Sequence, residues 1–106
     1  MIELFDEDAS EISKLIADGA LYPVFQPIFD YRLRAILGYE ALIRGPADSR
    51  LHRPDQLFAA AAACAMTLDL EHACREASLR AFVAQRLCGR LFLNASPGSL
   101  LDPRMM

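Results

Sequence analysis

The 106-residue sequence predicts an α/β fold in which an antiparallel hairpin is followed by a β–α–β unit. Two runs rich in strand-forming residues, 21–30 and 35–45, are joined by only four residues, which favours an antiparallel hairpin. An alanine-rich helical stretch (54–87) and a third apolar run from residue 90 come next. Because a helical crossover joins parallel strands, the second and third strands should be parallel. At 54% hydrophobic, the chain can bury one small core.

The first elements are a helix and an edge strand. Residues 8–18 predict a short helix with Ile12, Leu15 and Ile16 on one apolar stripe, and Gly19 is expected to end it. The strand over 21–30 contains Pro23 and Pro27. Because proline has no N–H to donate to a ladder, this strand should lie at the edge of the sheet or pair irregularly.

Two helices and a strand complete the predicted order. Pro54 suits the first turn of a helix over 54–66, and a second helix is expected from 68 to 87. The third strand should start at residue 90 and break at the Ser-Pro-Gly turn of 96–98. The second helix has a face of mostly small apolar residues that should pack on the sheet: Leu70, Cys74, Ala77, Ala81, Ala84 and Cys88.

Composition argues against several functional classes. The net charge is −3 and the isoelectric point is near 5.2, whereas a nucleic-acid-binding surface is normally basic. The acidic N-terminus does not resemble a signal peptide, and the longest apolar run, 57–66, is too short to span a bilayer. Three cysteines without a close pairing motif suggest reduced thiols. These features predict a cytoplasmic protein that binds no nucleic acid and has no membrane segment in this chain.

Polar residues recur near the ends of the predicted strands. Because strand side chains alternate, Glu40 and Arg44 share one face of the second strand. Gln26 lies within an apolar face of the first strand, and Asn94 within one of the third. Glu40 and Asn94 offer oxygen ligands suited to Mg²⁺, Ca²⁺ or Mn²⁺, and Arg44 offers a planar donor group suited to phosphate. In the alternative interpretation, Glu40 and Arg44 form an internal salt bridge and the amides are hydrogen-bonded core residues. The pattern alone leaves both interpretations open.

Three segments together resemble a known family. "FQPIFD" (25–30), "GYEALIRG" (38–45) and "LFLNAS" (91–96) resemble the EAL domain of cyclic di-GMP phosphodiesterases, and the likeness runs over about residues 21–103. The resemblance implies a modified (β/α)₈ TIM-like barrel whose first strand is antiparallel to the others. It also implies metal-dependent hydrolysis of cyclic di-GMP to linear pGpG, with Mg²⁺ or Mn²⁺ as cofactor. Residues 1–20 would then be an N-terminal helical segment, and 21–106 the N-terminal portion of the domain.

The resemblance also implies roles for five residues. Glu40 would be a metal ligand and Asn94 a second one. Arg44 would hold a phosphate of the substrate, while Gln26 and Leu42 would contact the nucleotide. One departure is Gly45, since many family members have tryptophan after the arginine.

A larger departure is that the sequence ends after about three strands, so the family's later metal carboxylates and its catalytic lysine are not among these residues. The catalytic set is therefore incomplete in this chain, and the isolated polypeptide is expected to be inactive. The alternative is a degenerate EAL module that binds cyclic di-GMP or a protein partner without catalysis. A helical interaction fragment with a coincidental motif would leave the polar strand ends unexplained.

An open part of a barrel would expose strand edges and apolar surface. We therefore expect copies of the chain to associate as a homo-oligomer or by domain swapping.

Overall fold

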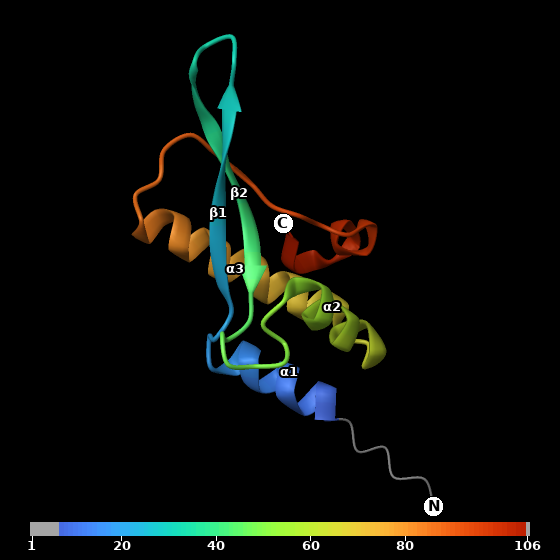
Figure 1. Ribbon diagram of the computed structural model, residues 1–106. Helices are drawn as coiled ribbons and strands as arrows, with labels where there is room; N and C mark the ends of the chain where they lie inside the picture. Colours follow the sequence, from blue (N-terminus) through green and yellow to red (C-terminus); the bar gives the residue numbers. More distant parts are fainter. Residues whose placement is uncertain (1–6, 106) are drawn as a thin grey trace, which may run out of the picture.

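The computed structural model describes residues 7–105 as a mixed α/β fold (Figure 1). Its sheet has three strands. The helices and strands follow the predicted order. They are α1 (Glu7–Ala17), β1 (Tyr22–Asp30), β2 (Ala35–Arg44), α2 (Pro54–Ala63), α3 (Thr67–Ala84) and β3 (Arg90–Phe92), followed by the 3₁₀ turns η1 (Pro97–Leu101) and η2 (Pro103–Met105).

The sheet has the order β1-β2-β3. β1 and β2 pair antiparallel from Tyr22↔Arg44 to Asp30↔Ala35, with an irregularity between Ile28 and Phe29. β2 and β3 pair parallel. The predicted hairpin and the predicted parallel crossover are therefore both confirmed. β1, which contains both prolines, lies at an edge of the described sheet, as the missing N–H groups require.

The hydrophobic core lies between the three helices and the base of the hairpin. α3 crosses one face of the hairpin (Figure 1), and the ring of Phe82 contacts those of Phe25 and Tyr39 at centroid distances of 6.0 and 6.5 Å. The buried cluster draws on all three helices, β2, the loop before α2 and the residue just before β1: Ile12, Leu15, Leu21, Ile43, Leu51, Leu57, Ala60, Ala61 and Leu70. The far end of the hairpin extends beyond the helices (Figure 1), and Tyr31 at its tip is 85% exposed.

Both long helices are shorter than predicted. α2 ends at Ala63 rather than residue 66, and α3 ends at Ala84 rather than residue 87. After α2, Ala65 has φ 58° and the Met66 N–H donates to the Ala61 carbonyl oxygen at 2.8 Å, as in a Schellman motif. α3 ends in a similar way, with Arg86 at φ 55°. Neither helix end is marked by a glycine or a proline, so the apolar periodicity predicted both helices about three residues too long.

The prediction for the buried face of α3 holds for its first part, since Leu70 lies in the core and Cys74 and Ala77 pack against it, but not for its end. Of the predicted face, Leu70 is buried, Cys74, Ala77 and Ala81 are half-buried, and Ala84 and Cys88 are exposed. The other fully buried residues of α3 are polar: Glu71, Arg75 and Ser78. The reason is that α3 packs against the segment after β3 as well as the sheet, and the Ser96 hydroxyl donates to Glu71 Oε2 at 2.9 Å.

The third strand is also shorter than expected, because it ends at Phe92 and leaves Asn94 beyond the ladder. Its only partner within residues 7–105 is β2, through three residue pairs. Within the same range, none of the helices has the length and apolar character needed to cross a membrane.

Candidate functional site

Gln26 and Glu40 lie directly opposite each other in the hairpin. The register pairs Gln26 with Glu40 and Val24 with Leu42, so these side chains share one face of the sheet. α3 covers the other face, where Ala41 and Ile43 are buried. On the Glu40 face, Gln26 and Val24 are exposed and Glu40 is half-buried. The two polar residues are thus on the accessible side of the hairpin.

Asn94 lies two residues after the end of β3, the strand that pairs with β2 beside Glu40. Phe92 lies beside Glu40 in the parallel β2–β3 pairing. In a parallel ladder, neighbouring residues share a face, and residues two apart along a strand do so as well. The backbone at residue 93 leaves the ladder, so the side chain of Asn94 is positioned by the loop rather than by strand hydrogen bonds.

Three of the five candidate residues line one cavity of about 270 Å³. Leu42 and Arg44 reach it from the end of β2, and Asn94 reaches it from the segment after β3. The remaining walls come from α2 and α3, from Leu93, and from Ala41 and Ile43 on the face of β2 that packs against the helices. Glu40 and Gln26 do not line this cavity. The structure therefore gathers Leu42, Arg44 and Asn94, and leaves Glu40 and Gln26 on the neighbouring open face.

The proposed internal salt bridge between Glu40 and Arg44 does not form among the described residues. Four residues along a strand span about 13 Å, which is too far for a direct pair between side chains that stand side by side. Arg44 instead uses Nη1 to donate to the backbone carbonyl oxygen of Ile43 at 2.9 Å. The alternative interpretation of this pair is therefore wrong.

Gly45 follows Arg44 at a point where two backbone segments meet. Its N–H donates to the His52 carbonyl oxygen at 3.0 Å, and its own carbonyl oxygen lies 2.8 Å from His52 Nδ1. A Cβ at this position would collide with the backbone carbonyl oxygen of Leu51. The presence of glycine here, where many proteins of the resembling family have tryptophan, thus has a local cause. This loop leaves no room for a side chain at residue 45.

Glu40 and Asn94 have the right chemistry for a hard divalent cation but are too few to enclose one. A carboxylate and an amide oxygen match the ligands that Mg²⁺ and Mn²⁺ prefer, with water completing the shell. Within residues 7–105, no three His, Cys, Asp or Glu side chains gather at a point that could hold a metal ion. These two residues can supply part of a metal site, and further ligands are needed to complete it.

Sequence reasoning missed a polar stripe on α3. Glu71, Arg75 and Ser78 are all buried, at the four- and three-residue spacing of one helical face. That spacing was the signal available in the sequence. Arg75 and Ser78 also line the cavity that contains Arg44. The neighbouring Cys74 lines it too, and burial, reinforced by the Glu71 carboxylate, raises the pKa of its thiol to about 12.

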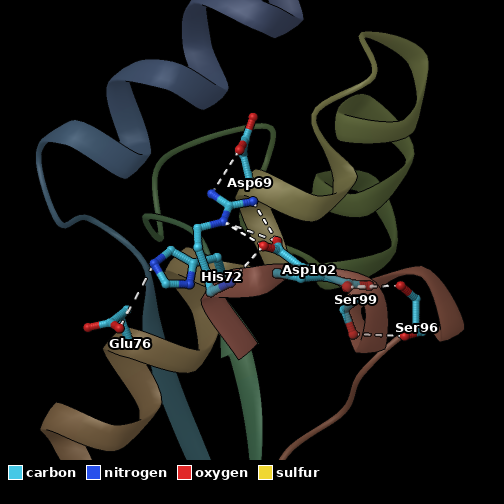
Figure 2. Close-up of polar contacts among 8 residues, drawn as sticks. Asp69, His72, Glu76, Ser96, Ser99 and Asp102 are labelled. Carbon is cyan, nitrogen blue, oxygen red and sulfur yellow. Dashed lines mark hydrogen bonds and ion pairs between the residues drawn. The ribbon is translucent and has the colours of Figure 1, made fainter. Parts of the chain in front are cut away.

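A second polar cluster fastens the C-terminal turns to α3 (Figure 2). The Arg104 guanidinium donates to both carboxylate oxygens of Asp102, at 2.7 to 3.1 Å, and to Asp69 Oδ1 at 3.0 Å. These bonds hold the pKa of Asp102 at about 2 and raise that of Arg104. In the preceding turn, the Ser99 hydroxyl donates to the Ser96 carbonyl oxygen at 2.8 Å. This cluster fixes the segment that leads away from Asn94.

Comparison with known proteins adds one finding. A family model described as the EAL domain matches residues 9–106. The match covers nearly all of the chain, including most of α1 and all five candidate residues. No significant match to a curated protein was found.

Proposed function

Because the chain belongs to the EAL domain family, which is the family of cyclic di-GMP phosphodiesterases, we propose that it forms the N-terminal part of such an enzyme. The proposed reaction is the metal-dependent hydrolysis of cyclic di-GMP to linear pGpG. The observation that carries the proposal is the common cavity of Leu42, Arg44 and Asn94, with Glu40 and Gln26 on the adjoining face of the hairpin. Residues 21–106 are the proposed portion of the domain and residues 1–20 the segment before it, of which residues 1–6 lie outside the described part, while the family match begins at residue 9.

In this proposal each residue has a role that follows from its chemistry and position. Glu40 and Asn94 would hold Mg²⁺ or Mn²⁺, and EAL domains are generally metal-dependent. The bound cation would polarise the phosphodiester and activate water. Arg44 contributes a fixed positive charge and N–H donors for a phosphate oxygen. Leu42 presents an apolar surface to the nucleotide, and Gln26 offers amide donor and acceptor groups from the next strand.

The proposed architecture is the opening of a (β/α)₈ barrel with an antiparallel first strand. Its support is the observed order, in which β1 is antiparallel to β2 and β2 is parallel to β3 across a helical connection. In barrels of this type, substrates bind at the carboxyl ends of the parallel strands. Arg44 is the last residue of β2, and Asn94 follows the end of β3.

Binding of cyclic di-GMP to the 106-residue chain tests the proposal. Isothermal titration with and without Mg²⁺ should show metal-dependent binding that Glu40→Ala removes. Asp48→Ala is the matched control, because Asp48 is an exposed carboxylate in the loop after β2. Hydrolysis to pGpG, followed by chromatography, should be absent, since Glu40 and Asn94 alone do not complete a two-metal site. Turnover that Glu40→Ala abolishes would contradict that expectation.

The second candidate is a module that binds cyclic di-GMP or a protein partner without catalysis. It is favoured by the small number of metal ligands within residues 7–105. Binding that is equally tight with and without Mg²⁺, and unaffected by Glu40→Ala, would support this candidate over the phosphodiesterase. If the nucleotide does not bind under either condition, both nucleotide-binding candidates fail.

We also propose that copies of the chain associate through the sheet. In the described residues β1 and β3 are the two edge strands, and Val24, Phe29 and Phe92 expose apolar surface. Sedimentation velocity at increasing concentration should show dimers or larger species. A single monomeric species throughout would overturn this proposal.

A further inference from the structure

α3 buries a guanidinium group without a partner. Arg75 is only 8% exposed, and both Nη1 and Nη2 are buried without a hydrogen-bond partner within residues 7–105. Burying a cation is unfavourable unless charge and hydrogen bonds compensate it. The two Nη atoms of Arg75 are therefore available to donate hydrogen bonds to a further binding partner.

The nearest carboxylates are already engaged by other groups. Asp102 accepts hydrogen bonds from Arg104 on both of its oxygens. Glu71, one turn before Arg75, accepts a hydrogen bond from Ser96. Neither carboxylate forms an ion pair with Arg75 in the described part of the chain. The charge of Arg75 helps to lower the pKa of Asp102, but its Nη1 and Nη2 atoms have no hydrogen-bond partner within residues 7–105.

Arg75 lines the same cavity as Arg44. The residues that line it include these two arginines, from α3 and from the end of β2, together with Ser78 and Asn94. None of the residues that line this cavity is Asp or Glu. The Cys74 thiol in the same wall stays neutral at physiological pH, because burial disfavours its thiolate. The lining of the cavity therefore includes two arginines and no carboxylate, while Glu71 lines an adjoining hollow that shares Cys74 and Asn94 with it.

We propose that this cavity is an oxyanion site in which Arg44 and Arg75 together bind a phosphate group, with Ser78 as a further donor. Two guanidinium groups are suited to this task, because each presents a planar set of donors that matches phosphate oxygens. The assignment of that phosphate to cyclic di-GMP rests on the proposed function. Arg75 then becomes a substrate-binding residue supplied by a helix rather than by a strand end. At about 270 Å³, the cavity also leaves space for atoms attached to the phosphate.

The test uses the 106-residue chain with inorganic phosphate and cyclic di-GMP as separate probes. Isothermal titration should show that Arg75→Gln weakens binding of both probes by about tenfold to a hundredfold, the loss typical of a hydrogen-bonded charge. Arg75→Lys should recover part of that loss, because it keeps the charge but not the planar donor group. Arg80→Gln is the matched control on the same helix. Its side chain is 80% exposed and its described ion pair is with Glu76, so affinities should stay within about twofold of the wild type.

Thermal unfolding followed by circular dichroism separates binding from a structural role. If Arg75 serves to bind a ligand, Arg75→Gln removes a buried charge whose Nη1 and Nη2 atoms lack hydrogen-bond partners within residues 7–105, and the melting temperature should stay the same or rise. A fall in melting temperature with unchanged phosphate affinity would assign Arg75 to the core and overturn the proposal. If Arg75→Gln does not fold, NMR spectra of the wild-type chain provide the measurement, through the Nε–Hε resonances of the arginine side chains. Inorganic phosphate should then shift the Arg75 signal and not that of Arg80, and an unshifted Arg75 signal overturns the proposal.

The two probes distinguish failure of this site from failure of the proposed function. If cyclic di-GMP binds equally to the wild type and to Arg75→Gln, the oxyanion site is wrong and the nucleotide function stands. If inorganic phosphate binds through Arg75 but cyclic di-GMP does not bind, the oxyanion site stands and the nucleotide function is wrong. If neither probe binds, both are wrong.

Discussion

The two faces of β2 are built for different purposes, although their residues alternate along one strand. On one face Ala41 and Ile43 are buried against the helices, and Ile43 belongs to the hydrophobic core. On the other face Glu40, Leu42 and Arg44 are half-buried, and none of the helices described within residues 7–105 packs over Ile36 or Val24. The comparison indicates that the packed face supplies stability, while the open face and its cavity end present chemical groups.

Truncating one residue on each face is the strongest test of this difference. Ile43→Ala should lower the free energy of unfolding by about 2–5 kcal/mol, because it leaves a cavity in the core. The adjacent Leu42→Ala should cost roughly 1 kcal/mol or less, since this side chain is only half-buried. Urea denaturation followed by circular dichroism measures both changes.

If Ile43→Ala leaves too little folded protein, Ile43→Val should still cost about 0.5–1.5 kcal/mol. Equal losses for Ile43→Ala and Leu42→Ala would show that the two faces contribute alike to stability, contrary to the comparison.

A smaller effect is expected where β3 joins the sheet. A Cβ at Gly38 would collide with the backbone of Arg90, the residue paired with it in the parallel ladder. Gly38→Ala should therefore push β3 away from β2 and cost about 1–3 kcal/mol. Hydrogen exchange of the β3 amides should become faster.

Gly98→Ala is the control for that substitution, because its new methyl group would meet Leu68 Cδ2 at an ordinary 3.6 Å. Unchanged β3 exchange in Gly38→Ala would mean that the close approach of the two backbones is not required. Since Asn94 follows β3, the same variant should also weaken any binding that depends on Asn94.

The mildest test concerns the cluster that fastens the segment after Asn94. Hydrogen bonds from Arg104 lower the pKa of Asp102 to about 2, from an ordinary value near 3.8. Because the folded-state pKa is the lower one, the stabilisation is fully present above about pH 4 and is lost as the pH falls towards 2. The urea midpoint should therefore drop over that window in the wild type.

Asp102→Asn should reduce this acid-dependent loss and should also lower the midpoint at neutral pH, because Arg104 then keeps only Asp69 of its two carboxylate partners. Asp48→Asn, on an exposed loop residue, is the control. An identical pH profile for the wild type and Asp102→Asn would show that the Asp102–Arg104 pair does not stabilise the fold.

Local patterns in the sequence were sufficient to predict the order of the helices and strands and which side chains share each face of the hairpin. Alternation placed Glu40, Leu42 and Arg44 together, and the short connection after Asp30 correctly indicated an antiparallel pair. The prolines in β1 correctly indicated an edge strand. These features follow from the period of two along a strand and from missing backbone donors, which are properties of neighbouring residues.

Packing between segments that are distant in the sequence determined the buried face of α3 and the position of Arg75. Apolar periodicity identified only part of the buried face of α3, because the sequence did not reveal that residues after β3 fold back against Glu71. For the same reason, the burial of Arg75 and its place in the cavity beside Arg44 could not be anticipated. A helical pattern defines which side chains share a face, but burial depends on what packs against that face, and here the partner is a segment more than 20 residues away along the chain.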